Sequence, residues 1–250
     1  MKNFIRRVLN GVSAGLPAET DEPIRAELFS IERLEQHAES LALAQRITTK
    51  RGAGRGLANR LRENDRTLLD AYRATARASR EERGITPAAE WLLDNFHVAQ
   101  EQIREIREDL PRGFYRGLPK LAEGPLTGYP RVFGVAWAFV AHTDSRFDPE
   151  MLRRFVLAYQ RVQPLTIGEL WAVAITLRIV LVENLRRAAE RIVSERAARQ
   201  AADALADRLL SPGSAGTEAR RSFSGGSRKS RCREPSQCSW FSVCAIKILR

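Results

Sequence analysis

The sequence predicts an all-α fold: an irregular bundle of six or seven helices with a long Pro/Gly loop, a long C-terminal helix and a disordered tail. Apolar side chains recur at spacings of three and four, which is the period of an amphipathic helix. The pairs Thr86-Pro87 and Asp148-Pro149 stand where two of these stripes begin, and such pairs are typical of helix starts. No Pro or Gly interrupts residues 169–210. The predicted organisation is a flexible N-terminus (1–20), a helical domain (21–210) and a disordered tail (211–250).

The first helix is expected to begin at Asp21, with Pro23 in its first turn. Its apolar stripe would comprise Ile24, Leu28, Ile31, Leu34, Ala38 and Leu41. Residues 50–56 are rich in glycine and basic residues and predict a flexible linker. A second helix would follow and end at Gly84. Its core side is predicted to carry Leu57, Leu61, Leu68, Tyr72, Thr75 and Ser79.

The third helix has the clearest start signal in the chain. Thr86 is the expected N-cap and Pro87 the first helical residue, where a missing N–H removes no helical hydrogen bond. The stripe continues for about six turns at 3.6 residues per turn. Its members are Leu92, Phe96, Ala99, Ile103, Ile106 and Leu110. This face is therefore predicted to build the core.

The opposite face of the third helix carries Glu90, Asp94, His97 and Glu101. One copy of Asp-x-x-His resembles half of a carboxylate di-metal site, and such a site needs a second matching motif from another helix. Neither His37 nor His142 has a carboxylate three residues before it. A solvated face is the favoured interpretation, and a small metal-dependent helical hydrolase is the alternative.

Residues 111–130 contain four prolines and four glycines, which we expect to exclude regular structure. A loop of this length inside a compact domain is often functional or forms an interface. The loop and the apolar start of the last helix are both expected to serve in docking onto a partner. The predicted docking surface comprises Phe114, Tyr115, Tyr129 and Trp171.

Three further helices are predicted. Val132–His142 is nearly all apolar and should be buried, and Asp148 should cap a helix that ends before Pro164. Thr166 and Glu169 have the spacing of a capping box. The last helix would be a rod of about 43 residues, roughly 65 Å long at 1.5 Å per residue.

Composition limits the functional classes. Eight of the 41 Lys and Arg residues, but only two of the 30 Asp and Glu, lie in residues 211–250, so the helical body is only mildly basic. Nucleic-acid binding is weakly indicated, and a helical adaptor at an anionic membrane surface stays open as an alternative. For His142 and Asp144 two interpretations stay open, an acid/base pair or the end of a helix followed by a turn. The most apolar stretch, residues 170–182, is too short for the roughly 20 residues of a membrane span.

The composition changes after Leu210. Nine serines and all three cysteines, Cys232, Cys238 and Cys244, lie in residues 211–250. A helical body without cysteine fits a reducing compartment. The tail is interpreted either as disordered protein or as the product of a shifted reading frame. Reading the coding DNA beyond codon 210 in the other two frames would separate these interpretations.

Several segments together resemble the amino-terminal region of the bacterial cyclic β-1,2-glucan synthases, over about residues 24–210. The segments are Glu27-Leu-Phe-Ser-Ile-Glu-Arg-Leu34, Ile85-Thr-Pro-Ala-Ala-Glu-Trp-Leu-Leu-Asp-Asn-Phe-His97, Leu118-Pro-Lys-Leu121, Gly128-Tyr-Pro-Arg131, Ala141-His-Thr-Asp-Ser-Arg-Phe147 and Gln163-Pro-Leu-Thr-Ile-Gly-Glu-Leu-Trp171.

The resemblance implies a very large inner-membrane enzyme that builds a cyclic glucan from UDP-glucose with a divalent metal. Such glycosyltransferases need an Asp-x-Asp-type arrangement and a Gln-x-x-Arg-Trp motif, and neither occurs in residues 1–250. No catalytic, cofactor-binding or metal-binding residue is therefore carried over. The expected role is a non-catalytic fragment, inactive alone, at the cytoplasmic face of the inner membrane. Its expected partner is the remainder of the synthase.

Overall fold

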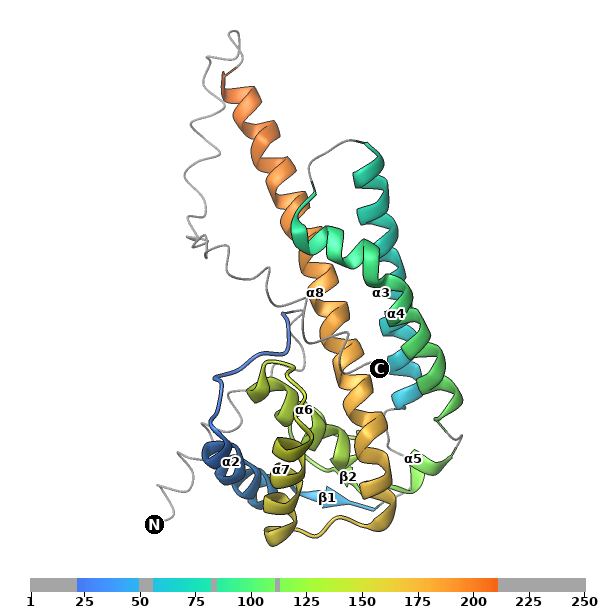
Figure 1. Cartoon of the computed structure of the whole chain (residues 1–250), viewed down its shortest axis with the longest axis vertical. Helices are drawn as coiled ribbons and strands as arrows, with labels where there is room; N and C mark the ends of the chain where they lie inside the picture. Colours follow the sequence, from blue (N-terminus) through green and yellow to red (C-terminus); the bar gives the residue numbers. More distant parts are fainter. Residues whose placement is uncertain (1–21, 50–55, 82–84, 111–112, 211–250) are drawn as a thin grey trace.

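The all-α prediction is confirmed by a computed structural model, which describes residues 22–49, 56–81, 85–110 and 113–210 (Figure 1). These residues form seven helices and one two-stranded sheet. The predictions for residues 1–20, for most of the 50–56 linker and for the tail lie outside the described residues. In chain order the elements are α2 (Ile31–Ala44), β1 (Ile47–Thr48), α3 (Leu57–Arg80), α4 (Pro87–Glu108), α5 (Phe114–Gly117), β2 (Lys120–Leu121), α6 (Arg131–Thr143), α7 (Pro149–Val162) and α8 (Ile167–Leu210).

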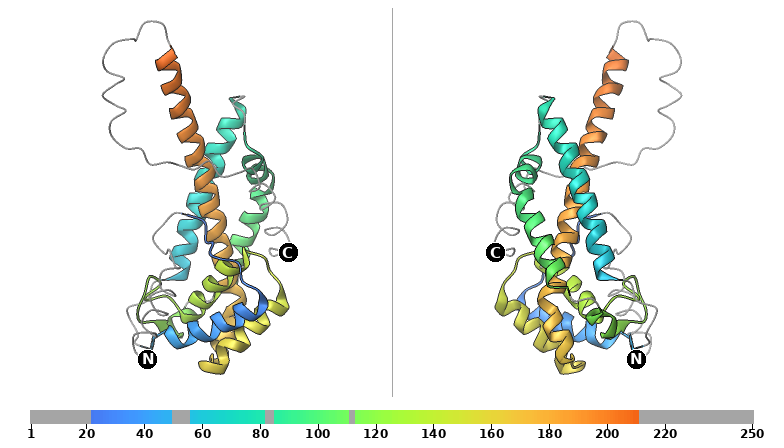
Figure 2. Two further views of the ribbon diagram at one scale, coloured as in Figure 1. Left: turned by 90° about the vertical axis from the view of Figure 1, so that its left-hand side faces the viewer. Right: turned by 90° about the vertical axis from the view of Figure 1, so that its right-hand side faces the viewer.

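Helix α8 is the axis of the molecule. Its first half packs against α6, and α3 and α4 lie along it further on, as Figures 1 and 2 show. Helix α2 packs on α7 at the end where α8 begins. The last turns of α8 extend past the ends of α3 and α4 (Figure 2). The rod predicted for this segment is confirmed as one helix of 44 residues.

Helix α6 supplies the centre of the core. Every residue of this 13-residue helix is buried except His142. Trp137, Phe133 and Phe139 are among the largest fully buried side chains. A helix that is apolar on all sides must be covered on all sides, and α2, α8 and the β2 segment all contact it. The sequence-based expectation of a buried short helix is confirmed.

The predicted first helix starts ten residues too early. Helix α2 begins at Ile31, where the hydroxyl of Ser30 accepts a hydrogen bond from the backbone N–H of Arg33. The residues before it are extended along the end of α6, where the N–H of Ala26 donates to the carbonyl of Ala141 at 2.8 Å. Ile24 is buried in the core. Tertiary hydrogen bonds and burial therefore replace the helical pattern that the sequence suggested.

Regular structure is also present in the Pro/Gly segment, where none was expected. Leu121 of β2 pairs with Ile47 of β1, and α5 forms a single turn. A loop closes on β2 because the N–H of Leu121 donates to the carbonyl of Tyr129 at 3.0 Å and Gly128 returns a bond to Leu121 at 2.9 Å. Gly124 and Gly128 have φ of 87° and 85°, which only glycine adopts without strain. The glycines here allow tight turns that place Leu121 in the core.

The predicted helix starts are confirmed where the signal is local. Thr86 accepts from the N–H of Ala89, and Asp148 accepts from two backbone N–H groups of α7. The end predicted for the second helix, Gly84, is not described, and α3 ends at Arg80. The expectation for Ser79 is wrong: it is exposed, and Ala78 faces the core instead.

Candidate docking surface

An exposed apolar surface covers the start of α8. Ile167 and Trp171, one turn apart, are 76% and 79% exposed, and Leu170 and Phe114 are each 40% exposed. Gly168 lies beneath the ring of Phe114, because a Cβ built on this glycine would be 3.6 Å from Cζ of the ring. We call these four side chains, Phe114, Ile167, Leu170 and Trp171, the apolar patch. Exposed apolar clusters of this kind mark interaction surfaces.

Of the four side chains predicted for a docking surface, Phe114 and Trp171 belong to the apolar patch. Tyr115 borders it, with its ring 5.2 Å from that of Phe114 and edge-on to it. Tyr115 is half-buried, and burial raises the pKa of its hydroxyl to about 12, with Asp109 acting in the same direction. It closes the patch on its inner side.

Tyr129 does not reach this surface. It is 6% exposed, and its hydroxyl accepts a hydrogen bond from Arg60 at 2.8 Å. Ile167 and Leu170, by contrast, belong to the patch and were missed. Apart from Glu169, the first two turns of α8 carry no polar side chain, and this pattern could have indicated that the residues on the side opposite Ala172 would be left uncovered.

A buried ion pair fixes the helix turn that carries the apolar patch. Arg131 Nε and Nη2 donate to the two carboxylate oxygens of Glu169 at 2.8 and 2.5 Å. The same carboxylate accepts from the backbone N–H of Thr166 at 2.9 Å, and Glu169 N–H donates to the Thr166 hydroxyl, which confirms the capping box. Burial alone would lower the pKa of Arg131, but the bonds to Glu169 hold it above its ordinary value. The start of α8 is therefore anchored to α6.

A second buried network joins α3 to the middle of α8. The carboxylate of Glu183 accepts from Arg60, Asn64 and Arg187. Burial would raise the pKa of this carboxyl, but Arg60 and the other donors lower it to about 2. The guanidinium groups of Arg60 and Arg187 also lie 5.7 and 5.0 Å from the ring centre of Trp137. The network has a structural role, since all its members lie between packed helices.

The polar face of α4, for which a solvated surface was favoured over a metal site, is exposed. Glu90, Asp94, His97 and Glu101 are all exposed on α4. Within the part of the chain that the structure describes, no three or more His, Cys, Asp or Glu side chains lie together as a metal site would require.

His142 and Asp144 belong to different networks. The ring of His142 stacks on Phe29 with centres 4.0 Å apart, and its Nδ1–H donates to the carbonyl of Glu27 at 2.8 Å. Asp144 has a left-handed backbone and forms an ion pair with Arg25 at 3.3 Å. Asp144 thus ends α6, and both residues hold the extended segment before α2. This is the simpler of the two predicted alternatives, the end of a helix.

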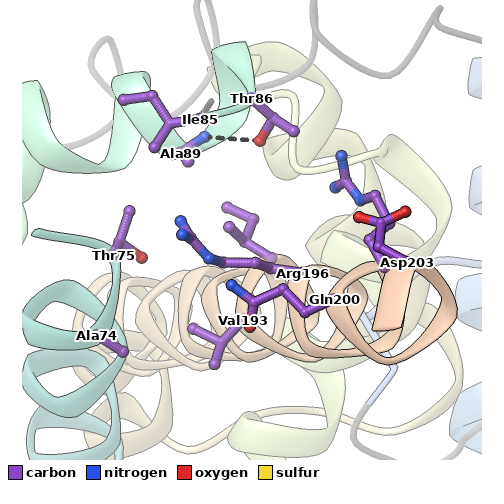
Figure 3. Close-up of a pocket in the computed structure, with 11 residues that line it drawn as sticks. Ala74, Thr75, Ile85, Thr86, Ala89, Val193, Arg196, Gln200 and Asp203 are labelled. Carbon is purple, nitrogen blue, oxygen red and sulfur yellow. Dashed lines mark hydrogen bonds between the residues drawn. The ribbon is translucent and has the colours of Figure 1, made fainter. Parts of the chain in front are cut away.

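A pocket of about 300 Å³ opens between the end of α3, the start of α4 and the far part of α8 (Figure 3). The sequence reasoning did not find it, because its residues come from three segments far apart in the chain. They are Ala74, Thr75, Ile85, Thr86, Ala89, Ile192, Val193, Arg196, Arg199, Gln200 and Asp203.

Over the described ranges no helix is long and apolar enough to span a membrane.

Comparison with known proteins gives the relationship. No family model matches the chain. The cyclic beta-(1,2)-glucan synthase NdvB of Rhizobium meliloti (strain 1021) is 41% identical to it over 208 residues. The match covers 80% of this chain and 7% of the relative, so the chain spans a small fraction of the length of the curated relative it matches. The resemblance found in the sequence is thereby confirmed, and this chain is related to one short segment of a cyclic β-1,2-glucan synthase.

Proposed function

We propose that the chain is a non-catalytic helical fragment of a cyclic β-1,2-glucan synthase, corresponding to its amino-terminal region, and that its task is to dock onto the rest of that enzyme. The observation that carries the proposal is the 41% identity, which extends over 80% of this chain and only 7% of the relative. A match that covers most of a short chain but little of its relative is expected when the chain corresponds to one small part of a much larger protein.

The chemistry of glucan synthesis belongs elsewhere in such an enzyme. Residues 1–250 contain neither the Asp-x-Asp pattern that would hold a divalent metal on UDP-glucose nor a Gln-x-x-Arg-Trp motif. The buried acidic groups Glu169 and Glu183 are each paired with arginine between helices, and neither lines the pocket between α3, α4 and α8. No cofactor is therefore assigned to this chain, and the metal and UDP-glucose are assigned to the remainder of the synthase.

The apolar patch is the surface we assign to docking. Tryptophan is one of the residue types most enriched among the energetic hot spots of protein interfaces. Trp171 is exposed and lies next to the helix turn that the Glu169–Arg131 pair anchors. A rigid, pre-positioned aromatic side chain loses little conformational entropy on binding. The proposed partner is the glycosyltransferase region, which places this chain at the cytoplasmic face of the bacterial inner membrane.

The test is a binding measurement between the purified 250-residue chain and a synthase from which the matched segment has been deleted, held in detergent. We expect saturable binding that Trp171→Ser weakens at least tenfold. Leu205→Ser is the matched control, because Leu205 is also exposed but lies near the opposite end of α8. Equal binding by both variants would refute the assigned surface, and absence of binding would refute the docking role.

The same preparation tests the absence of catalysis. The chain alone should transfer no glucose from radiolabelled UDP-glucose in the presence of Mg²⁺ or Mn²⁺. Glucan synthesis by the purified chain would overturn the non-catalytic assignment.

A further inference from the structure

The pocket between α3, α4 and α8 contains an unusual arginine. From Ser194 to Leu209 every residue of α8 is exposed except Arg196, which is only partly accessible. Figure 3 shows the reason: its side chain lies across the pocket toward Thr75, beneath Ile85 and Thr86. The pocket therefore partly covers the charged side chain of Arg196, whereas the side chains next to it on α8 are exposed to water.

The arginines just before it on α8 are paired within the helix. Arg186 bonds Glu190, Arg187 bonds Glu183 and Arg191 bonds Glu195, each at a spacing of four. Arg196 breaks this pattern, since the residues three and four positions away are Ile192, Val193, Arg199 and Gln200. Among the described residues no carboxylate lies within ion-pair distance of it. A cation that is partly withdrawn from water and has no carboxylate partner loses hydration, which a bound anion would compensate.

The remaining surroundings of Arg196 are of two kinds. Gln200 and Arg199 add donors on the same helix, and Asp203 adds one negative charge, so the lining carries a net positive charge. The start of α4 also faces the pocket, where a helix of 22 residues presents the positive end of its dipole. The rest of the lining is apolar: Ala74, Ile85 and Ala89 come from the α3 and α4 side, and Ile192 and Val193 from the turn of α8 before Arg196.

We propose that this pocket binds a small amphipathic anion, a carboxylate or phosphate group on a short apolar chain, and that Arg196 holds its charge. The apolar wall takes the chain, and Arg196 with Gln200 takes the anionic oxygens. A volume of about 300 Å³ is at the lower end of ligand pockets, so the ligand is small. The site is distinct from the apolar patch, about 25 residues away along α8.

Calorimetric titration of the 250-residue chain tests the proposal. The probes are hexanoate and butyl phosphate, with 1-hexanol and inorganic phosphate as the apolar and anionic halves. We expect one equivalent of at least one amphipathic anion to bind, at least tenfold more tightly than 1-hexanol or inorganic phosphate. Absence of saturable binding by both anions would overturn the proposal, as would binding of inorganic phosphate alone with equal affinity.

Two variants assign the site. Arg196→Gln should weaken binding at least tenfold, whereas Arg191→Gln should leave it unchanged, because Arg191 is exposed, lies outside the pocket and is paired with Glu195. Ala74→Leu, which fills the apolar side, should also abolish binding. Thermal unfolding of each variant must match that of the parent chain. Binding that is indifferent to both Arg196→Gln and Ala74→Leu would place the ligand elsewhere and refute the assignment.

Discussion

Arg60 and Glu183, 123 residues apart in the chain, form a two-point ion pair: Nε lies 2.9 Å from Oε2 and Nη2 lies 2.8 Å from Oε1. Their side chains are 14% and 2% exposed. The pair connects α3 to α8 at the level of Trp137, so the two longest packed helices are held in a single register by one carboxylate.

Removing that carboxylate should be severe. Glu183→Ala leaves Arg60 and Arg187 without their main partner in a buried position, and breaking a buried pair in this way costs about 3–5 kcal/mol. The measurement is urea unfolding followed by circular dichroism. Glu195→Ala is the control, because its pair with Arg191 is half-exposed on both sides and is worth about 0–1 kcal/mol. Similar losses for both variants would contradict the importance of the network.

Stability should fall in mild acid because of His37. Its ring lies 4.4 Å from that of His142, and burial, with a contribution from His142, lowers its pKa from 6.5 to about 4. The folded state therefore binds its proton less readily than the unfolded state. The full contribution is present above pH 6.5 and is lost as the pH falls toward 4, by up to about 3 kcal/mol at 1.36 kcal/mol per pKa unit.

The measurement for His37 is the free energy of unfolding in urea between pH 4 and pH 7.5. Burial lowers the pKa of His142 as well, so its titration acts in the same direction. His37→Phe keeps a ring of similar shape without a titrating group, and its profile should be flatter than that of the parent chain over this range. Parallel profiles for the two proteins would show that His37 does not control the acid sensitivity.

Two helical glycines should respond in opposite directions to alanine. A Cβ at Gly134 of α6 would lie 2.9 Å from Leu121 Cδ1 in the core, so Gly134→Ala should destabilise by about 1–3 kcal/mol despite better helix propensity. At Gly168 of α8 the nearest atom would be 3.4 Å away, an ordinary contact. Gly168→Ala should therefore stabilise by up to about 1 kcal/mol. Melting temperatures of the two variants on either side of the parent value would confirm both expectations.

The start of α8 offers a graded series. Thr166→Ala removes the hydroxyl that accepts from Glu169 N–H and donates to the Glu169 carboxylate, and should cost about 1 kcal/mol. Glu169→Gln also leaves the buried guanidinium of Arg131 without a counter-charge and should cost several times more, on the order of 3–5 kcal/mol. Equilibrium unfolding distinguishes the two. A larger loss for Thr166→Ala than for Glu169→Gln would contradict the assigned anchoring role of the ion pair.

The sequence predicted what is encoded locally. Thr86-Pro87, Asp148-Pro149 and the Thr166–Glu169 spacing each satisfy backbone groups within a few residues, so their structures follow from their neighbours alone. The apolar stripe of α4 was likewise readable from its period.

What escaped prediction depends on partners far away in the chain. Ile24 is extended because its N–H donates to Asn184, 160 residues later, and no local pattern reports that bond. Tyr129 is buried because Arg60 and Phe133 cover it. Leu121 forms a strand only because Ile47 lies beside it. The pocket is of the same kind, since Thr75, Thr86 and Arg196 come together only through the packing of three helices.

Helix α8 has a mechanical consequence for the two surfaces it carries. Trp171 and Arg196 lie on one unbroken helix, about 38 Å apart along its axis at 1.5 Å per residue. A tilt of about 5° at the Trp171 end would swing Arg196 by about 3 Å, comparable to the length of a hydrogen bond. A stiff lever of this kind makes the width of the pocket depend on how the distant end of the helix is seated.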